Sequence, residues 1–495
     1  MTHLLDYIEL TARRFPDKTA FSDVNESVTF ARLRELGQRV GTYIAARAKK
    51  TGLPVAVLTT HSVADVAAFM GALYAGCFYV PLDGSAPETH TNARLDAIDP
   101  VLVIDAKTLA ELPVADSSVI DHAALDAIRR KILSADPAYA IFTSGSTGTP
   151  KAAVVSHGSV INLTEWMCTE FNFTERTVFA GQAPFYFDSS VQELYSTLKC
   201  GGRTHLFPKH YFISPLKVLE LVDEIGANVM PWAAAAVKLI ANSKAFEKYV
   251  PGGVTDVIFG GENMPAKILN IWRRAMPDAR FTNVYGPAET TVDCSYYTVT
   301  RDLADEESVP IGYPVRDTEL LLLDEDKNPV PNNGLNEPGE LYVRGAGVGL
   351  GYYNNPGRTA DSFIQNPNSL CRDIIYRTGD IAKVNEHGEL VFLARADNQV
   401  KHMGSRVELG EVEAAAAAID GVRLVCCSYD KENAKILMFY EGTVDEKALT
   451  AGLSTRLPRY MCPNVVIKVD EMPAIPSGKI DRLKVRKVYY DDKQL

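Results

Sequence analysis

Cysteine is sparse in this sequence, and its placement argues against disulfide and zinc frameworks. Eight cysteines are scattered over 495 residues, and no two of them form a C-x-x-C pair. Disulfide-rich secreted domains carry dense cysteines at regular spacings, and structural zinc sites use closely spaced pairs. The pattern therefore favours reduced thiols in a cytoplasmic protein.

The sequence also lacks an excess of positive charge, a long apolar run and a secretion signal. The net charge is −11 and the isoelectric point is about 5.4, which argues against a nucleic-acid binder that works by general electrostatics. The most apolar stretch, "VADVAAFMGALYAGCFYVPL", is interrupted by Asp65, so we expect no membrane span. The N-terminal segment "MTHLLDYIELTARRFPDKTAF" carries charges throughout, which is typical of an amphipathic helix and not of a signal peptide.

What is present indicates a globular protein with more than one domain. Hydrophobic residues make up 46% and charged residues 23% of the chain, and its length exceeds what one compact core usually holds. Strand patterns such as "VAVLTT", "YVPLD" and "AYAIFTSGS" alternate with helical patterns in the first part of the chain, which predicts an α/β fold. Between residues 310 and 394, short strands alternate with turns rich in Pro, Gly and Asn. We therefore expect a large N-terminal domain of α/β layers, residues 1–395, that contains a β-rich subdomain.

The pattern changes again beyond Arg395. "ELGEVEAAAAAIDG" is typical of a helix that stops at Gly421, "VRLVCCSY" and "KILMFYEG" predict a hairpin, and "DEKALTAGLSTRLP" predicts a further helix. About 100 residues with their own apolar set are enough for a separate domain. We therefore expect residues 396–495 to form a small α+β domain.

The stretch "FTSGSTGTPK", residues 142–151, crowds small hydroxyl residues and glycines around one lysine. Successive amides in such a loop form an anion-binding nest, although Ser, Thr and Gly are also common in ordinary surface loops. The nucleotide-binding pattern G-x-x-x-x-G-K-[ST] does not fit, because Pro150 and Lys151 stand where its Gly and Lys would be needed. From these residues alone, both the phosphate loop and the surface loop stay open.

Taken together, the segments resemble the adenylate-forming enzymes. Within them, the sequence is most similar to the amino-acid-activating adenylation domains of nonribosomal peptide synthetases and to D-alanine–carrier-protein ligases. The resemblance covers nearly the whole chain, in the order of that superfamily. It is carried by "VTFARL", "GCFYVPLD", "FTSGSTGTPK", "FDSS", "YGPAE", "GELYVRGAGVGLGYY", "YRTGD", "RADNQVKHMGSRVELGEVE", "LPRYMCP" and "SGKIDR".

The resemblance implies a site for ATP. The loop would wrap the β- and γ-phosphates, Tyr285 would stack on the adenine, and Asp380 would accept hydrogen bonds from both ribose hydroxyls. Glu289 would hold Mg²⁺, a hard cation that takes a carboxylate together with phosphate oxygens and waters. The nucleotide-binding residues that the resemblance implies are Thr143, Ser144, Gly145, Ser146, Thr147, Gly148, Lys151, Asn283, Tyr285, Gly286, Asp380, Arg395 and Lys479.

Two positions depart from the usual pattern of the superfamily. Ala152 stands where glycine is usual, which implies a slightly less mobile phosphate loop. Ala288 stands where threonine is usual, so we expect one hydroxyl contact to the α-phosphate to be missing and nucleotide binding to be weakened without being abolished.

The resemblance also implies a reaction in two steps. An amino acid and ATP would give an aminoacyl-adenylate and pyrophosphate, with Lys479 of the C-terminal domain stabilising the charge at the α-phosphate. The small domain would then swing about Asp397, bring Lys401 and Gly404 near a thiol, and allow transfer of the aminoacyl group. The thiol would be the phosphopantetheine arm of a carrier protein supplied in trans, since we find no carrier attachment site of the Gly-Gly-His-Ser type. An acidic carrier would suit the basic residues near the end of the chain, although a solvated tail is an equal alternative: Arg482, Lys484, Arg486 and Lys487.

Asp188 in "FDSS" matches the aspartate that binds the α-ammonium group in amino-acid activators. The side-chain pocket implied by the resemblance is polar, because Gln192 and Asp293 belong to it, and Gly260 gives it depth. We therefore rank glutamine first as substrate, basic amino acids second and glutamate third. The implied substrate-binding residues are Asp188, Ser189, Gln192, Pro231, Ile258, Gly260, Val284, Val292 and Asp293.

Two other functions stay open at this point. An acyl- or aryl-CoA ligase of the same superfamily is disfavoured by Asp188 and Gln192. A non-catalytic nucleotide-binding regulator is disfavoured by Glu289, Asp380 and Lys479, which are all intact.

Overall fold

A computed structural model gives the structure of the protein. It describes residues 1–111, 120–143, 150–395, 399–403, 405–431, 433–473, 480 and 482–490. The chain divides into two compact units. The first contains Met1–Gly84, Ile98–Ile141 and Ala152–Ala396, and the second contains Ser85–Ala97, Phe142–Lys151 and Asp397–Leu495.

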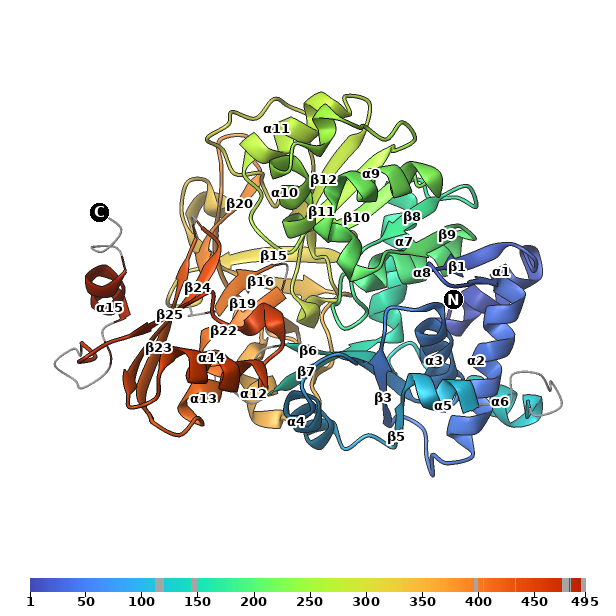
Figure 1. Cartoon of the computed structure of the whole chain (residues 1–495). Helices are drawn as coiled ribbons and strands as arrows, with labels where there is room; N and C mark the ends of the chain where they lie inside the picture. Colours follow the sequence, from blue (N-terminus) through green and yellow to red (C-terminus); the bar gives the residue numbers. More distant parts are fainter. Residues whose placement is uncertain are drawn as a thin grey trace. The chain divides into compact units, whose positions relative to one another are not determined.

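The largest sheet of the first unit has nine strands (Figure 1). Its six central strands are parallel, as expected for an α/β fold, and antiparallel strands flank them at both ends. Helices α7 to α11 lie between β7 and β12 in the sequence. Helix α10 packs on β10 and β11. The strand order is β14 (Tyr313–Pro314), β13 (Ser295–Thr298), β12 (Arg280–Tyr285), β11 (Asp256–Gly260), β10 (Val229–Ala233), β8 (Val178–Gly181), β9 (Arg203–Leu206), β1 (Thr19–Ser22) and β2 (Ser27–Thr29).

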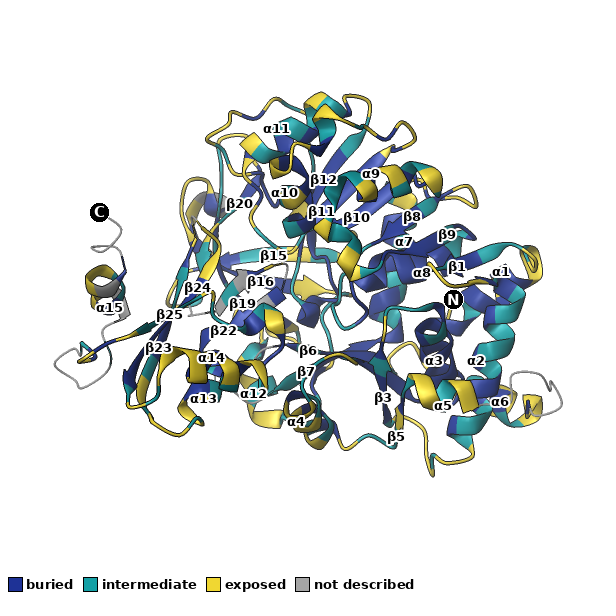
Figure 2. Ribbon diagram, viewed as in Figure 1, coloured by how far each residue is buried: buried dark blue, intermediate teal, exposed yellow. Residues whose placement is uncertain are grey.

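A second sheet has six strands, and its central strands β3, β4 and β6 are parallel. Strands β3 and β4 are buried along almost their whole length, and β3 is dark blue in Figure 2. Burial on both faces explains why these strands are apolar runs without alternation. The strand order is β17 (Gly351–Tyr352), β7 (Lys151–Ser156), β6 (Pro137–Thr143), β4 (Phe78–Asp83), β3 (Pro54–Thr59) and β5 (Leu102–Ile104).

The helices of the N-terminal part begin where the sequence offers suitable caps. Helix α2 starts after Thr29, whose hydroxyl accepts a hydrogen bond from the Arg32 amide, and α3 starts with a capping box formed by Ser62 and Asp65. Asp65, which interrupts the apolar run, is therefore a helix cap. The helices are α1 (Leu5–Arg14), α2 (Phe30–Ala45), α3 (Val63–Tyr74), α4 (Glu88–Ile98), α5 (Ala106–Glu111), α6 (His122–Arg129), α7 (His157–Glu170), α8 (Ser190–Cys200), α9 (Pro215–Glu224), α10 (Ala234–Asn242) and α11 (Ala266–Ala275).

The predicted β-rich subdomain is an antiparallel sheet of five strands. Its strand β16 is buried on both faces over its first five residues, and Leu341, Tyr342 and Val343 are completely or almost completely buried. The sheet contains β15 (Thr318–Leu323), β16 (Gly339–Gly345), β18 (Phe363–Gln365), β19 (Ile374–Val384) and β20 (Leu390–Arg395), and α12 (Pro356–Ser362) precedes β18.

The second unit has a core of its own. The predicted hairpin is present as β23 and β24, which pair antiparallel, and β25 joins β24 in parallel. The basic segment near the end of the chain is a helix, with Val485 fully buried and Arg486 donating to the Tyr429 carbonyl at 2.8 Å. The alternative of a merely solvated tail is therefore wrong for Arg486. The elements are β21 (Gln399–His402), β22 (Ser405–Glu408), α13 (Leu409–Ala417), β23 (Val422–Asp430), β24 (Lys435–Gly442), α14 (Glu446–Ser454), β25 (Val465–Lys468) and α15 (Arg482–Tyr489).

These elements confirm the predicted α/β fold with a β-rich portion. All eight cysteines are free, as their scattered positions predict. Within the described ranges, no helix combines the length and the apolar character needed to cross a membrane. Short 3₁₀ helices occupy some connections: η2 (Lys209–Ile213), η3 (Ala245–Glu247), η4 (Ala288–Thr290), η5 (Pro331–Gly334) and η6 (Arg459–Met461).

Candidate active site

Strand β12 presents two sets of predicted site residues on its two faces. Its parallel register with β11 places Val284 beside Gly260, and the register of β10 with β11 places Pro231 beside Ile258. Because side chains alternate along a strand, these four residues share one face of the sheet. Asn283 and Tyr285 point to the opposite face of β12. The pocket residues and the nucleotide residues of this strand are thus separated by the sheet.

The predicted nucleotide side is centred on Asp380, which is 3% exposed. The Tyr285 hydroxyl donates to Asp380 Oδ2, and Arg395 Nη1 donates to Asp380 Oδ1 at 2.6 Å. Arg395 is also the cross-strand partner of Asp380 between β19 and β20. Burial raises the pKa of the Tyr285 phenol well above its usual range, and the neighbouring Asp380 adds to this effect. The structure therefore joins three predicted nucleotide-binding residues in one buried cluster.

The sequence did not predict the bonds within this cluster. Each oxygen of Asp380 already accepts one hydrogen bond from the protein, so the carboxylate is fixed in position before any ligand arrives. Each carboxylate oxygen has two lone pairs, and the second pair is what a ribose hydroxyl would use. Asn283 is likewise held: its Nδ2 donates to the Pro310 carbonyl at 2.7 Å, which directs that nitrogen toward the protein. Its amide oxygen has the chemistry to accept from a base edge.

Glu289 lies in η4 and is fully buried. The Tyr352 hydroxyl donates to Glu289 Oε1 at 2.6 Å, a contact that sequence reasoning did not find. In the part of the chain that the structure describes, no group of three or more His, Cys, Asp or Glu side chains is placed to hold a metal ion. A single fixed carboxylate suits Mg²⁺ that brings phosphate oxygens and waters as its other ligands. It does not suit a metal held by protein groups alone.

The turn after η4 has an unusual backbone. Thr291 and Val292 have φ angles of 60° and 70°, a left-handed conformation that β-branched residues rarely adopt. The Thr291 hydroxyl donates to the Gly347 carbonyl at 2.6 Å and helps to hold the turn. A Cβ atom at Gly286 would come within 2.2 Å of the Val292 carbonyl oxygen, so only glycine allows this approach. The turn leaves Asp293 only 5% exposed.

The predicted amino-acid side is centred on the pair Gln192 and Asp293. Gln192 Nε2, on α8, donates to Asp293 Oδ2 at 2.6 Å, and both residues are buried. Burial raises the pKa of Asp293 to about 8, opposed by the hydrogen bond from Gln192 and reinforced by the charge of Asp188. Asp188 and Ser189 are partly exposed and lie immediately before α8. The structure thus brings Asp188, Gln192 and Asp293 into one acidic site.

The structure gives a reason for glycine at position 260 that the sequence did not suggest. A Cβ atom at this position would come within 2.4 Å of the Val284 carbonyl oxygen on the neighbouring strand. The close approach of β11 and β12 therefore demands glycine there, in addition to any depth that its missing side chain gives to the pocket.

Several predicted site residues lie outside the described residues or near their limits. Thr143 ends β6, is 7% exposed, and has a hydroxyl without a hydrogen-bond partner among the described residues. Lys151 begins β7 and Lys401 lies in β21. Of the two departures from the family pattern, Ala152 is 2% and Ala288 is 6% exposed. Outside the described residues lie Ser144, Gly145, Ser146, Thr147, Gly148, Asp397, Gly404 and Lys479.

Comparisons with known proteins agree with this geometry. Residues 8–353 match the AMP-binding enzyme family. Gramicidin S synthase 2 from Brevibacillus brevis is 32% identical over 482 residues, which cover 94% of this chain. The chain spans only 11% of the length of that relative.

Solved structures show the same fold. PA1221, an NRPS protein containing adenylation and PCP domains, superposes with a TM-score of 0.84 at 25% identity, over 98% of this chain and 84% of its own chain. IdnL1 superposes with a TM-score of 0.80 at 27% identity, over 96% of this chain and 99% of its own.

Proposed function

Because the chain belongs to the AMP-binding enzyme family, we propose that it activates an amino acid with ATP and passes it to a carrier-protein thiol. In the first step an amino-acid carboxylate oxygen attacks the α-phosphorus of ATP. The bond to the β-phosphate breaks, and the products are aminoacyl-adenylate and pyrophosphate. In the second step a thiol attacks the aminoacyl carbonyl, and AMP leaves.

The observation that carries the proposal is the closeness of Asp188 to Asp293. The charge of Asp188 contributes to raising the pKa of Asp293, so the two carboxyl groups lie near each other in a mostly buried site. An opposite charge nearby stabilises a carboxylate, and Asp188 lies partly exposed immediately before α8. An α-ammonium group beside Asp188 gains this attraction, whereas a fatty or aryl acid brings no positive charge. The pocket therefore favours amino acids over the substrates of acyl- and aryl-CoA ligases.

The nucleotide residues fit the first step. The fixed carboxylate of Asp380 accepts hydrogen bonds from the ribose hydroxyls, and Tyr285 flanks the adenine. Arg395 lies beside Asp380 and donates a hydrogen bond to it. Glu289 would hold Mg²⁺ together with ATP, and the ion supplies positive charge at the phosphates. The preorganisation of these groups is what stabilises the transition state of such reactions, in which there is little covalent chemistry for the protein to do.

The side-chain pocket supports glutamine as the first candidate substrate. The amide nitrogen of Gln192 donates one of its two N–H groups to Asp293, and its second N–H group is left for other acceptors. With its pKa raised to about 8, Asp293 is mostly protonated at pH 7 and can itself donate to the substrate carbonyl. Gln192 Oε1 then accepts from the substrate NH₂. A primary carboxamide satisfies both groups at once.

The carrier protein is the partner that PA1221 suggests, since that protein combines adenylation and PCP domains. Whether the carrier acts in trans stays a prediction from the sequence.

Pyrophosphate release across a panel of amino acids and simple acids tests the proposal. We expect ATP-dependent release with polar amino acids, glutamine foremost, weak release with leucine, and none with fatty or aryl acids. Preference for a simple acid would indicate a CoA ligase. Nucleotide binding without release on any acid would indicate a non-catalytic regulator.

Asp293→Ala is the matched variant for the side-chain part of the proposal. Unchanged relative preferences among polar and apolar amino acids in this variant would mean that Asp293 does not read the side chain. The glutamine ranking would then have no physical support, while the adenylation function itself would stand.

A further inference from the structure

Tyr139 lies on β6, and its ring is part of the aromatic core of the first unit. The residue is completely buried. It is the register partner of Tyr79 between the parallel strands β4 and β6, and the centroids of the two rings lie 5.7 Å apart. The ring position is therefore fixed by packing.

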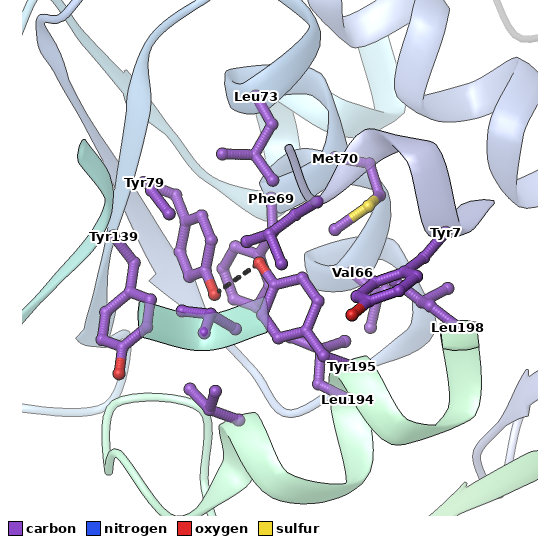
Figure 3. Packing of buried hydrophobic residues seen from close by; sticks show 14 of the residues in the cluster. Tyr7, Val66, Phe69, Met70, Leu73, Tyr79, Tyr139, Leu194, Tyr195 and Leu198 are labelled. Carbon is purple, nitrogen blue, oxygen red and sulfur yellow. Dashed lines mark hydrogen bonds between the residues drawn. The ribbon is translucent and has the colours of Figure 1, made fainter. Parts of the chain in front are cut away.

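The hydroxyl of Tyr139 differs from the hydroxyls of Tyr79 and Tyr195 in its hydrogen bonding. The hydroxyls of Tyr79 and Tyr195 form a hydrogen bond of 3.0 Å with each other. The Tyr139 hydroxyl is buried and has no hydrogen-bond partner among the described residues. Figure 3 shows it pointing away from the Tyr79–Tyr195 pair, toward the start of α8. Since buried polar groups are almost always paired in native proteins, a ligand is the natural partner for this one.

The surroundings of the hydroxyl identify the ligand site. The pKa of the Tyr139 phenol is raised well above its usual range by burial first, and Tyr79, Asp188 and Asp293 add to the effect. Carboxylates act on a phenol in this way only from nearby. The hydroxyl therefore faces the same acidic site that holds Asp188 and Asp293.

We propose that the Tyr139 hydroxyl binds the α-ammonium group of the substrate beside Asp188, an inference that rests on the proposed function. An ammonium group has three N–H donors, and each needs an acceptor once water is excluded. The hydroxyl accepts one N–H and donates its own hydrogen to Asp188 or Asp293. The substrate class that uses all of these contacts is an amino acid with an unsubstituted α-amino group.

Tyr139→Phe tests the inference, because it removes only the hydroxyl and keeps the ring. We expect KM for the amino acid to rise about 10- to 100-fold, the usual effect of losing a hydrogen bond to a charged group. The factor should be the same for glutamine and ornithine, and KM for ATP should not change. Tyr195→Phe is the matched control: it removes a hydroxyl from the same aromatic layer whose partner is Tyr79, and it should leave both KM values near those of the wild type.

A second measurement uses the wild type itself. Glutamine methylated on its α-nitrogen has one α N–H fewer than glutamine. The wild type should therefore have a higher KM for it than for glutamine, and the ratio of the two KM values should be smaller in Tyr139→Phe. No discrimination by the wild type overturns the inference even if the variant does not fold.

The other outcomes separate the inference from the proposed function. An unchanged KM in Tyr139→Phe overturns the inference, as does an equal rise in KM for ATP, which would indicate a structural role. A factor that differs between glutamine and ornithine would mean that the hydroxyl reads the side chain, contrary to the inference. A wild type that releases pyrophosphate with no amino acid overturns the proposed function itself, before any variant is compared.

Discussion

Asp293 carries a carboxyl group whose charge state depends on burial and on two neighbouring residues. Gln192 donates to it from α8, and Asp188 acts on it from the segment before α8. With burial as the largest cause, its pKa is raised to about 8. Below that pH the group is mostly a neutral donor and matches a carboxamide. Above that pH it is an anion and matches a cationic side chain.

The preference of the enzyme between ornithine and glutamine should therefore depend on pH. Ornithine favours ionised Asp293, so below pH 8 its binding must release a proton, and its kcat/KM should rise by up to about tenfold per pH unit and level off near pH 8. For glutamine, kcat/KM should be flat below pH 8 and decline above it. Pyrophosphate release between pH 6.5 and 8.5 measures both. In Asp293→Asn, which cannot ionise, the ratio should lose this pH dependence; a wild-type ratio without a slope would contradict the protonation of Asp293.

Individual elements serve more than one site. On β12, Val284 faces the amino-acid side while Asn283 and Tyr285 face the nucleotide side, and the next turn carries Glu289 and Asp293. Under the proposed function, this one strand and its following turn would contribute to the binding of both substrates. The geometry of this segment should be sensitive to any change that separates the strand from the turn.

Gly286→Ala should make such a change. The new Cβ atom would lie 2.2 Å from the Val292 carbonyl oxygen and 2.9 Å from the Asp293 Cα atom, so the turn must move. We expect kcat/KM for the amino acid to fall at least about tenfold, since small misplacements of binding groups are costly. Gly357→Ala is the control: a Cβ atom there meets nothing within 4 Å, and alanine is the better helix former in α12. Equal kinetics of the two variants would show that the turn tolerates displacement.

Helix α8 carries a buried carboxyl group that the proposed reaction does not use. Glu193 is 1% exposed, and no other described residue supplies a hydrogen bond to either of its oxygens. Burial raises its pKa well above the usual value of a glutamate, because the buried site disfavours the charged form. A raised pKa contributes stability below the pKa of the unfolded chain, about 4.3, and this stability is lost as the pH rises.

Glu193→Gln should therefore stabilise the protein at pH 8 and matter little near pH 4.5. The gain in apparent Tm should be about 1 °C for each kcal/mol recovered, because the shift per kcal/mol becomes smaller as a chain becomes longer. Glu165→Gln is the matched control, because Glu165 is paired with Lys199 at 2.6 Å and with the Tyr7 hydroxyl at 2.9 Å. This control should lower Tm at pH 8. A fall in Tm for Glu193→Gln at pH 8 would show that the carboxylate is ionised and paired in solution.

Local patterns in the sequence predicted the elements better than their contacts. The strand expected at 79–83 is β4 (Phe78–Asp83). Such a strand can be predicted because consecutive residues carry both its apolar character and its strand preference. The hydrogen bonds of the site join residues about a hundred positions apart, such as Tyr285 with Asp380 and Gln192 with Asp293. No local sequence pattern shows that residues so far apart in the chain are hydrogen-bonded to each other. The resemblance to a family brought these residues together, but it did not give their bonds or the state of protonation.

At the scale of the whole molecule, the chain consists of two compact units. The first contains the described residues of the predicted nucleotide cluster and of the acidic pocket. The second contains the segment 397–495, in which the resemblance places the catalytic Lys479, and Asp397 lies at the predicted hinge. Both residues are outside the described ranges, so the alternation between two domain orientations stays a prediction from the sequence.

Lys479→Ala tests that alternation. An ammonium group about 4 Å from a phosphate oxygen is worth roughly 4 kcal/mol at an effective dielectric constant near 20, which corresponds to about three decades in rate. We expect adenylate formation, measured by pyrophosphate release, to fall by about that factor. Transfer from a preformed aminoacyl-adenylate to a thiol should be largely spared, because Lys479 would have left the site by then. Lys487→Ala is the control, since Lys487 is an exposed basic residue of α15; it should affect neither pyrophosphate release nor transfer to a small free thiol. If Lys479→Ala slowed both half-reactions by similar factors, Lys479 would act in both steps, and the two-orientation mechanism would be wrong for this protein.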